Sequence, residues 1–472
     1  MLLVEKLGYR HAHAANWALN GIDLELRPGR ALLVCGHSGS GKSTLLSVLS
    51  GLAPHYLKGE LRGRVSLDGE EPARLTLSEW GRRAGLMMQN PEAQFLAASV
   101  EEELLLTLRC RDVPARRAAE LTADRLERFG LEAIAGQSVF QLSEGQKQKV
   151  VLAALTALKP KMLLLDEPSA NLDPDSMAEL GLTLAGLKEE GLTMVIADHR
   201  LSWLDGLCEQ ALVLENGAAA RQGGWDMLKD PDLRKTFALR SIDPPARPAF
   251  GPGGGPGGGP GGPTDEARDG LIMENLSFAY PGRPELFSNL NGEFKCGLVT
   301  VLTGPSGQGK TTLAKVLCGL EKPGGGRVRF RADGGHAADQ CQVILQNADH
   351  QLYMASVRAE MDLSLGVQSG KMRKYPETDS ILADFGLKEL AERHPQSLSG
   401  GEKQRLTAAA GLAAGARFLV LDEPTSGLDG LNLRLMADQI RQAAARGPAV
   451  LVVTHDLELA GLCADALLTL PG

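Results

Sequence analysis

The chain has 472 residues, a length that predicts two to four domains. Its composition, with 43% hydrophobic and 23% charged residues, is that of a folded globular protein, and no uninterrupted apolar run is long enough to predict a membrane span. The net charge of −8 argues against a broad nucleic-acid-binding face, and seven scattered cysteines without a CxxC pair argue against a zinc site or a disulfide framework.

The first motif along the chain is a glycine-rich loop. The apolar run Leu32–Cys35 predicts a buried strand, and it is followed by GHSGSGKST at Gly36–Thr44 and by a helical stretch over Thr44–Leu52. Strand, glycine loop and helix in this order are the context of a phosphate-binding loop, because backbone N–H groups there face phosphates at a helix N-terminus. In such a loop, Lys42 reaches the β- and γ-phosphates and Ser43 gives its hydroxyl to Mg²⁺.

Polar side chains follow the next apolar runs. Gln89 opens the sequence QNPEAQ, and its amide can coordinate Mg²⁺ or water. The run Met162–Leu165 predicts a strand covered on both faces, and it ends in Asp166 and Glu167. At the carboxyl end of a parallel strand, the aspartate is expected to hold Mg²⁺ and the glutamate to deprotonate the attacking water. His199 follows another strand-like run and can position that water beside the γ-phosphate.

A stretch rich in glycine and proline interrupts the chain. Residues 251–263 read GPGGGPGGGPGGP, which forms neither a helix nor a strand ladder. We therefore expect a flexible linker over residues 241–270. It separates a first domain of residues 1–240 from a second domain of residues 271–472.

The second half repeats the motifs of the first. GPSGQGKTT at Gly304–Thr312 matches the first glycine loop, and several later motifs lie 256 residues after their counterparts, as from His199 to His455. Such a period indicates a duplicated domain and not a solenoid. A lone histidine is usually structural, but in both halves it follows the aspartate by 33 residues, which favours a function. The expected nucleotide-site residues of the second half include Lys310, Thr311, Gln346, Asp422 and Glu423.

Two further pentapeptides carry a family resemblance. LSEGQ at Leu142–Gln146 and LSGGE at Leu398–Glu402 match the signature sequence of the ATP-binding cassette (ABC) ATPases, and the chain resembles that family over nearly all of its length outside the linker. The resemblance implies an α/β fold with two P-loop NTPase domains. Each domain is expected to have a mostly parallel core sheet, an antiparallel β-subdomain and a helical signature subdomain.

The same resemblance implies two composite sites for ATP and Mg²⁺. The two cassettes would pair head to tail within the chain, so that each phosphate loop meets the signature of the other half. The expected catalytic residues are Glu167, His199, Glu423 and His455. The expected nucleotide contacts are Gly36, Ser38, Gly39, Gly41, Lys42, Ser43, Thr44, Gln89, Ser143, Gly145, Tyr280, Gly304, Ser306, Gly307, Gly309, Lys310, Thr311, Thr312, Gln346, Ser399 and Gly401. The expected metal ligands are Ser43, Gln89, Asp166, Thr311, Gln346 and Asp422.

The chain departs from the family pattern at three places. Glu144 replaces the first glycine of the signature, and Glu402 replaces the final glutamine. Glu144 would bring a carboxylate near the phosphates of the site built on Lys310, so we expect this site to be the kinetically different one. The family usually stacks adenine on an aromatic ring; Tyr280 fits that role in the second half, whereas the aligned residue in the first half is His11.

The sequences QNPEAQ and QNADHQ also resemble the ATPase subunits of energy-coupling factor importers. That resemblance implies a peripheral protein on the cytoplasmic face of a bacterial cell membrane. Its partners would be a coupling transmembrane protein and a substrate-capture protein, with no nucleic acid, and the cargo a vitamin or a transition-metal ion. The alternatives are the tandem ATPase of another ABC importer or exporter, or a ribosome-associated ABC ATPase. The intact second half and the Gly/Pro linker favour the first interpretation.

Overall fold

The computed structural model describes residues 1–243, 269–332, 340–344, 351–369, 377–398, 400–425 and 427–470. They form two compact units, whose main segments end at Asp243 and begin at Asp269. Gln346, Ser399 and all of the predicted linker except its ends lie outside the described residues.

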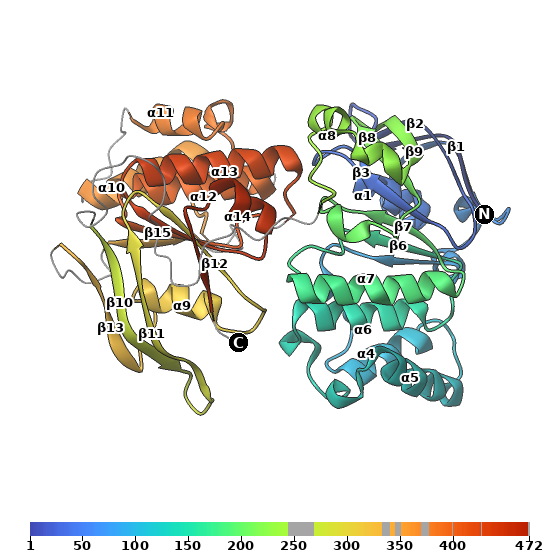
Figure 1. Cartoon of the computed structure of the whole chain (residues 1–472). Coiled ribbons are helices and arrows are strands. Elements are labelled where there is room, and N and C mark those ends of the chain that lie inside the picture. Colours follow the sequence, from blue (N-terminus) through green and yellow to red (C-terminus); the bar gives the residue numbers. More distant parts are fainter. Residues whose placement is uncertain are drawn as a thin grey trace. The chain divides into compact units, whose positions relative to one another are not determined.

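The first unit is built on a six-stranded sheet in which five neighbouring strands are parallel (Figure 1). The sixth strand, β9, pairs antiparallel with β8. The strands in spatial order are β5 (Ala84–Met87), β6 (Met162–Asp166), β7 (Thr193–Ala197), β3 (Ala31–Cys35), β8 (Gln210–Glu215) and β9 (Ala218–Gly224). Each residue of β3 and β7 is buried, as expected for strands covered on both faces.

Different layers cover the two faces of this sheet. Leu33 of β3 faces a core formed with helices α4 to α7, whereas Leu32 and Val34 face a second core formed with α1 and an antiparallel sheet. Figure 1 shows α6 and α7 on one side of β6 and β7 and α1 on the other. The antiparallel sheet consists of β2 (Leu19–Leu26), β1 (Leu2–His11) and β4 (Gly59–Leu67). The helices are α1 (Lys42–Leu49), α2 (Leu52–His55), α3 (Leu77–Gly81), α4 (Val100–Arg109), α5 (Ala115–Phe129), α6 (Glu144–Thr156), α7 (Pro174–Glu189) and α8 (Pro231–Thr236).

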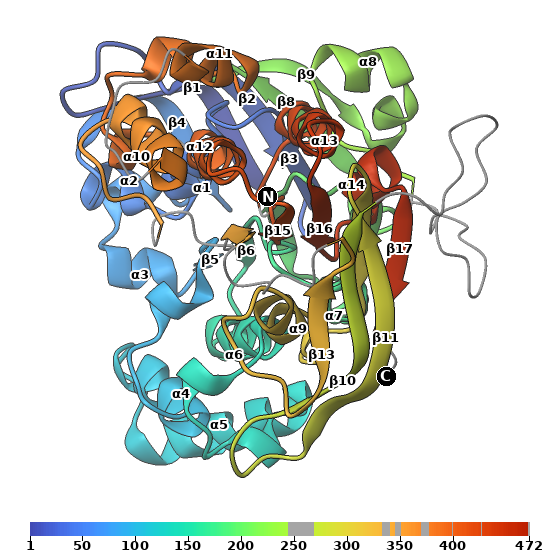
Figure 2. The ribbon, with the colours of Figure 1, turned by 90° about the vertical axis from the view of Figure 1, so that its left-hand side faces the viewer.

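The second unit repeats this plan with a five-stranded sheet that is parallel throughout. Figure 2 shows its antiparallel sheet on the side of α9, away from α10 to α12. The parallel strands in order are β14 (Cys341–Ile344), β15 (Phe418–Asp422), β16 (Ala449–Val453), β12 (Val299–Thr303) and β17 (Ala466–Thr469). The antiparallel strands are β11 (Glu285–Lys295), β10 (Gly270–Ala279) and β13 (Gly325–Phe330). The helices are α9 (Lys310–Leu317), α10 (Val357–Ser369), α11 (Glu377–Asp384), α12 (Gly400–Ala413), α13 (Gly430–Ala445) and α14 (Leu457–Cys463).

The predicted fold class is confirmed. Each unit combines a mainly parallel core sheet, a three-stranded antiparallel sheet and a group of helices that includes the signature sequence. In the first unit the signature serine begins α6: the Ser143 hydroxyl accepts a hydrogen bond from the Gln146 N–H, and the Gln146 side chain accepts one from the Ser143 N–H. This reciprocal pair is a capping box, so the signature sequence is itself the start signal of its helix.

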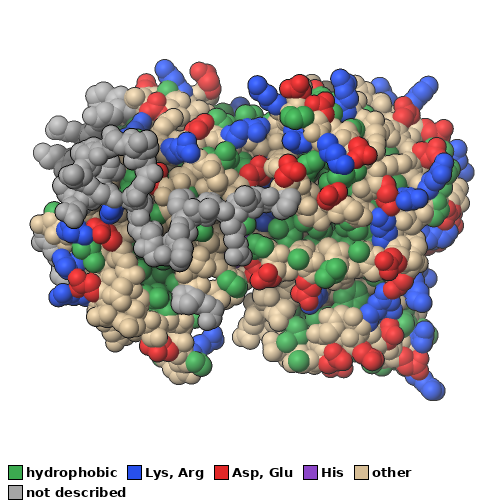
Figure 3. Space-filling model, viewed as in Figure 1, with side chains coloured by type: hydrophobic (Ala, Val, Ile, Leu, Met, Phe, Trp, Pro, Cys, Tyr) green, Lys and Arg blue, Asp and Glu red, His purple; other side chains and the backbone are tan. Residues whose placement is uncertain are grey.

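The surface carries charges of both signs. On the face of the first unit seen in Figure 3, lysine and arginine side chains are interspersed with aspartates and glutamates. Ion pairs also form in this unit, for example between Lys149 and Glu179 at 2.5 Å. Across the described ranges, no helix is both long enough and apolar enough to cross a membrane.

Candidate active sites

The first glycine loop connects β3 to α1 and requires glycine at two positions. Gly36 has a φ of 140°, and a Cβ there would lie 2.2 Å from the carbonyl oxygen of Leu214. Gly41 has a φ of 106°, and a Cβ there would lie 2.8 Å from the carbonyl oxygen of Ala18. Side chains are excluded at both positions by conformation and by space, as expected for a loop whose backbone N–H groups bind a ligand at the N-terminus of α1.

The second glycine loop has the same geometry. It connects β12 to α9, with φ values of 148° at Gly304, 82° at Gly307 and 87° at Gly309. A Cβ at Gly309 would lie 2.5 Å from the Leu286 side chain. Both halves of the duplication therefore fold into the loop that the sequence predicts.

Each loop holds a buried lysine in the same position. Lys42 Nζ donates hydrogen bonds to the carbonyl oxygens of Gly36 at 3.0 Å and His37 at 3.1 Å. Lys310 Nζ donates to those of Gly304 at 2.9 Å and Pro305 at 2.7 Å. Burial lowers the pKa of Lys42, and the nearby Glu167 carboxylate opposes that change. An ammonium group in this position is ready to meet an anionic ligand in the loop.

The aspartates that end β6 and β15 lie beside the hydroxyls that follow these lysines. Ser43 Oγ donates to Asp166 Oδ1 at 3.1 Å. Burial raises the pKa of Asp166 to about 6, although the hydrogen bond from Ser43 lowers it. Burial also raises the pKa of Asp422, against a hydrogen bond from Thr311. Asp422 Oδ1 is buried and has no hydrogen-bond partner among the described residues. Buried carboxyl oxygens beside a hydroxyl fit Mg²⁺, which prefers oxygen ligands.

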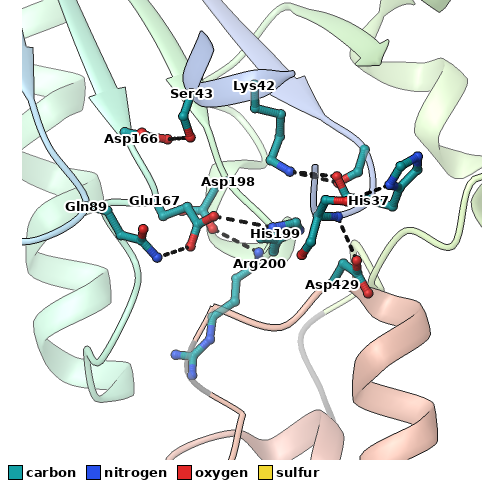
Figure 4. A network of polar contacts seen from close by, with 12 residues as sticks. His37, Lys42, Ser43, Gln89, Asp166, Glu167, Asp198, His199, Arg200 and Asp429 are labelled. Atoms are coloured by element: carbon teal, nitrogen blue, oxygen red, sulfur yellow. Dashed lines mark hydrogen bonds and ion pairs between the residues drawn. The ribbon is translucent and has the colours of Figure 1, made fainter. Parts of the chain in front are cut away.

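The glutamate of the first unit lies at the centre of a polar network (Figure 4). Glu167 has a left-handed backbone with a φ of 48°, and its N–H donates to the carbonyl oxygen of Ala197 at 2.7 Å. Its carboxylate accepts a hydrogen bond from Gln89 Nε2 at 2.9 Å, and His199 Nε2 lies 3.3 Å from its other oxygen. Three residues predicted from separate motifs thus come together at the carboxyl edge of the sheet.

The glutamate of the second unit has the same backbone but different partners. Glu423 has a φ of 48°, and its N–H donates to the carbonyl oxygen of Val453 at 2.8 Å. Its carboxylate accepts hydrogen bonds from Thr454 Oγ1 and from the His455 N–H, both at 3.1 Å. The His455 ring nitrogen Nε2 lies 3.6 Å away. Glu423 is therefore held by the backbone and hydroxyl of the segment that carries the histidine.

The aromatic positions also correspond between the units. Tyr280 packs edge-on against Phe278, with ring centroids 4.9 Å apart and an interplanar angle of 88°. His11 packs in the same way against Tyr9, at 5.0 Å and 86°. His11 thus takes the place of Tyr280 in the first unit, as the alignment predicts. The Tyr280 hydroxyl also forms a hydrogen bond of 3.1 Å with Thr312 Oγ1, which ties it to the glycine loop.

The signature residues lie on the helical group of each unit. Ser143 and Gly145 stand at the start of α6, and Gly401 lies in the first turn of α12. The predicted pairing of each signature with the loop of the other half stays a prediction, as do the catalytic and ligand roles of the individual residues.

Sequence reasoning missed two residues at this site, Gln94 and Asp198. The second glutamine of QNPEAQ fastens its own loop, because Gln94 accepts a hydrogen bond from the Met88 N–H at 2.8 Å and donates to the Leu86 carbonyl oxygen at 2.9 Å. The recurrence of this glutamine in QNADHQ was the available signal. The other residue is Asp198, a buried carboxylate beside His199. The sequence feature that could have indicated Asp198 is the difference between ADH in the first half and VTH in the second.

Comparison with known proteins agrees with this geometry. The sequence profile of the family described as ABC transporter matches residues 19–170 and 287–426, together more than half of the chain. A protein of Treponema denticola named "Putative ABC transporter ATP-binding protein" is 30% identical over 491 residues, which cover 100% of this chain and 96% of that protein. A Bacillus subtilis protein named "Putative HMP/thiamine import ATP-binding protein YkoD" is 30% identical over 499 residues, which cover 100% of this chain and 90% of that protein.

Solved structures show the same architecture. The protein named RNase-L Inhibitor is similar with a TM-score of 0.67 at 24% sequence identity, over 99% of this chain and 88% of that one. At this identity the likeness concerns the fold, while the family rests on the profile and the full-length relatives. The chain therefore belongs to the ABC transporter family, as an ATPase with two ATP-binding cassettes in one polypeptide.

Proposed function

We propose that this ATPase is the energy-coupling subunit of an importer of the energy-coupling factor type. It would hydrolyse ATP at two composite sites and drive the uptake of a vitamin or a transition-metal ion through separate membrane subunits. The observation that carries the proposal is that each cassette places a histidine beside the glutamate that follows a core strand, as two sites for hydrolysis would require. Of the two cargo classes, the name of the Bacillus subtilis relative, an HMP/thiamine importer, favours the vitamin.

Each described side chain has a proposed task in hydrolysis. The glycine loop and Lys42 would bind the phosphates of ATP through N–H groups and an ammonium. Glu167 would take a proton from the attacking water, which Gln89 and His199 would help to hold in line with the γ-phosphate. Ser43 and Asp166 would hold Mg²⁺, which when bound neutralises charge on the phosphate oxygens. Lys310, Glu423 and their neighbours would do the same in the second cassette. In each site, the signature of the opposite cassette would close over the γ-phosphate with its helix N-terminus.

The loops that follow β5 and β14 support docking to a membrane partner. Leu96 is 69% exposed and Tyr353, at the corresponding position of the second cassette, is 74% exposed. The backbone at Leu96 and Tyr353 is held in place by hydrogen bonds to buried glutamates. Glu103 accepts hydrogen bonds from the Leu96 and Ala97 N–H groups, and Glu360 accepts from the Tyr353 N–H. A large exposed side chain on hydrogen-bonded backbone, present at the same position in both halves, suits a pair of similar contacts with cytoplasmic helices of membrane subunits.

A capture experiment tests the proposal. The tagged chain is expressed in its native host, extracted from detergent-solubilised membranes and analysed by mass spectrometry, in parallel with a Leu96→Asp, Tyr353→Asp double variant. We expect the parent to capture a multi-span membrane protein together with a small substrate-binding one. The double variant should lose both partners while its ATPase activity in solution stays within about twofold. Capture of ribosomal proteins without a membrane partner would overturn transport and leave a soluble translation-linked ATPase.

A further inference from the structure

The segment that carries the histidine differs in chemistry between the two cassettes. Residues 197–200 read ADHR at the end of β7, and residues 453–456 read VTHD at the end of β16. The histidine is shared, but its neighbours on both sides have changed from Thr and Asp to Asp and Arg. Because of these exchanges, residues 198–200 and residues 454–456 form different hydrogen bonds.

In the first cassette, the residue before the histidine is a buried carboxylate with three donors. Asp198 is 2% exposed. Its Oδ1 accepts hydrogen bonds from Ser169 Oγ at 2.8 Å and from the Arg200 N–H at 2.9 Å, and its Oδ2 accepts one from the Ser169 N–H at 3.2 Å. A carboxylate buried at this depth persists only because such bonds replace its lost hydration. Ser169 lies in the loop that leads from β6 towards α7, two residues after Glu167.

A second bond joins the same two segments. The Arg200 side chain donates from Nη1 to the carbonyl oxygen of Leu172 at 3.1 Å. Residues 198–200 are therefore tied to residues 169–172 at two points, through Asp198 and through Arg200. Glu167 precedes the second segment and His199 lies within the first, and Figure 4 shows these two side chains facing each other.

In the second cassette, the corresponding residues bond locally. Thr454 Oγ1 donates to Glu423 at 3.1 Å and accepts from the Asp456 N–H at 3.0 Å. The Asp456 carboxylate caps α14 by accepting the N–H groups of its second and third residues. Thr425, the counterpart of Ser169, has a buried hydroxyl without a hydrogen-bond partner in the described part of the chain. The hydrogen bond that Ser169 donates to Asp198 in the first cassette thus has no counterpart from Thr425 among the described residues.

We propose that Asp198 is a positioning residue of the first cassette, which fixes His199 against Glu167 by tying the loop after β7 to the loop after β6. The hydrolytic pair of this cassette is then held in its working geometry before ATP arrives. In the second cassette Thr454 stands in place of Asp198, and its hydroxyl bonds directly to Glu423. The inference rests on the roles proposed for Glu167 and His199 and is independent of the transported solute.

Steady-state hydrolysis by the purified full chain tests this in a Glu423→Gln background, where turnover comes from the first cassette. Misplacement of a catalytic pair by a fraction of an ångström to 1 Å costs up to about 100-fold in rate. We therefore expect Asp198→Ala to lower kcat roughly 10- to 100-fold, with KM for ATP changed by less than about twofold. Asp198→Asn keeps an oxygen for the Ser169 hydroxyl and the Arg200 N–H but loses the bond from the Ser169 N–H, so it should lower kcat only about 3- to 10-fold.

A matched pair of hydroxyl deletions provides the control. Ser169→Ala should lower kcat about 3- to 10-fold, because one of three bonds is removed. Thr425→Val at the same place in the second cassette, measured in a Glu167→Gln background, should leave kcat unchanged. Each variant is first compared with its parent by thermal unfolding. If Asp198→Ala does not fold, the comparison of Ser169→Ala with Asp198→Asn and with the parent still tests the proposal.

Three results would overturn the proposal. They are an unchanged kcat in Asp198→Ala, an Asp198→Asn chain as slow as Asp198→Ala, and equal losses in Ser169→Ala and Thr425→Val. A failure of the roles proposed for Glu167 and Glu423 gives a different result. If these residues are not the bases, the chain that carries only Glu167→Gln and Glu423→Gln keeps its turnover.

Discussion

At the scale of single residues, Asp166 combines a cost in stability with a proposed role in metal binding. Burial raises its pKa to about 6 in the folded protein, whereas an unfolded chain releases this proton near pH 4. The folded protein therefore binds the extra proton between these values, and its free energy of unfolding falls as pH rises through this window. Without a cation, the charged carboxylate destabilises the first unit at neutral pH.

This linkage gives a prediction for Asp166→Asn in the absence of nucleotide and Mg²⁺. The amide stays neutral, so the stability advantage of the variant over the parent should grow by about 1 kcal/mol between pH 5 and pH 7.5. That corresponds to an increase of roughly 2–4 °C in the Tm difference of the first unit, measured by thermal scans at both pH values. Asp175→Asn, at an exposed position of α7, should show a Tm difference that does not change with pH. A constant difference for Asp166→Asn would contradict the raised pKa.

The glutamates give a second prediction at this scale. Replacing both Glu167 and Glu423 by glutamine keeps the size of the side chains and one acceptor oxygen in each, but removes the proposed base. The double variant should hydrolyse ATP roughly 10²- to 10⁴-fold more slowly than the parent. Equilibrium binding of ATP, followed with a fluorescent analogue, should change by less than about threefold. By contrast, Lys42→Ala should weaken ATP binding at one of two sites. Unchanged turnover in the double variant would exclude these residues as bases.

The sequence predicts a site residue well when its contacts are local in the chain, and less well when they come from a distant segment. Gly36 and Lys42 act through local backbone geometry, so a short motif is enough to predict them. Glu167 and His199 belong to motifs that meet because neighbouring parallel strands end at one edge. Asp198 was missed, because its importance depends on Ser169 in a different loop. Its burial is a property of the folded chain and not of its own segment.

At the scale of elements, the strands were predicted well because they are continuous apolar runs covered on both faces. Helix starts were less accurate. The helix after the first glycine loop begins at Lys42 in the structure, two residues before the predicted Thr44, because the glycine motif already belongs to its first turn. Such ends depend on cap geometry, which the apolar pattern does not report.

One prediction concerns the loop between β5 and α4. Glu103 is 4% exposed and accepts the N–H groups of Leu96 and Ala97, so it holds the exposed loop in place. Glu103→Ala should accelerate amide exchange at these two positions roughly 10- to 100-fold, because hydrogen bonds to a buried carboxylate are lost. Capture of the membrane partner should fall with it. Glu102→Ala removes an exposed carboxylate from the same helix and should change neither quantity. Unaltered exchange in Glu103→Ala would contradict this role.

At the scale of the whole molecule, the duplication produces two cassettes that are alike in fold and unlike in detail. Glu144 is one difference, since it stands in the first turn of α6 where the second cassette has a glycine. Its carboxylate pairs with Lys147 at 2.6 Å, and Lys147 also pairs with Glu92 at 2.5 Å. Part of the negative charge is thus balanced within the first cassette. What remains lies at a helix N-terminus, where it would compete with a phosphate.

The last prediction uses this difference to test how the cassettes pair. If the signature of the first cassette completes the site built on Lys310, Glu144→Gly should raise the turnover of that site about 3- to 10-fold, because a carboxylate near the γ-phosphate is removed. The rise should be seen in a Glu167→Gln background, where the second site hydrolyses ATP. In a Glu423→Gln background the same substitution should have no effect, which makes each background the control of the other. A rise confined to the Glu423→Gln background would mean that each cassette uses its own signature, and would contradict head-to-tail pairing.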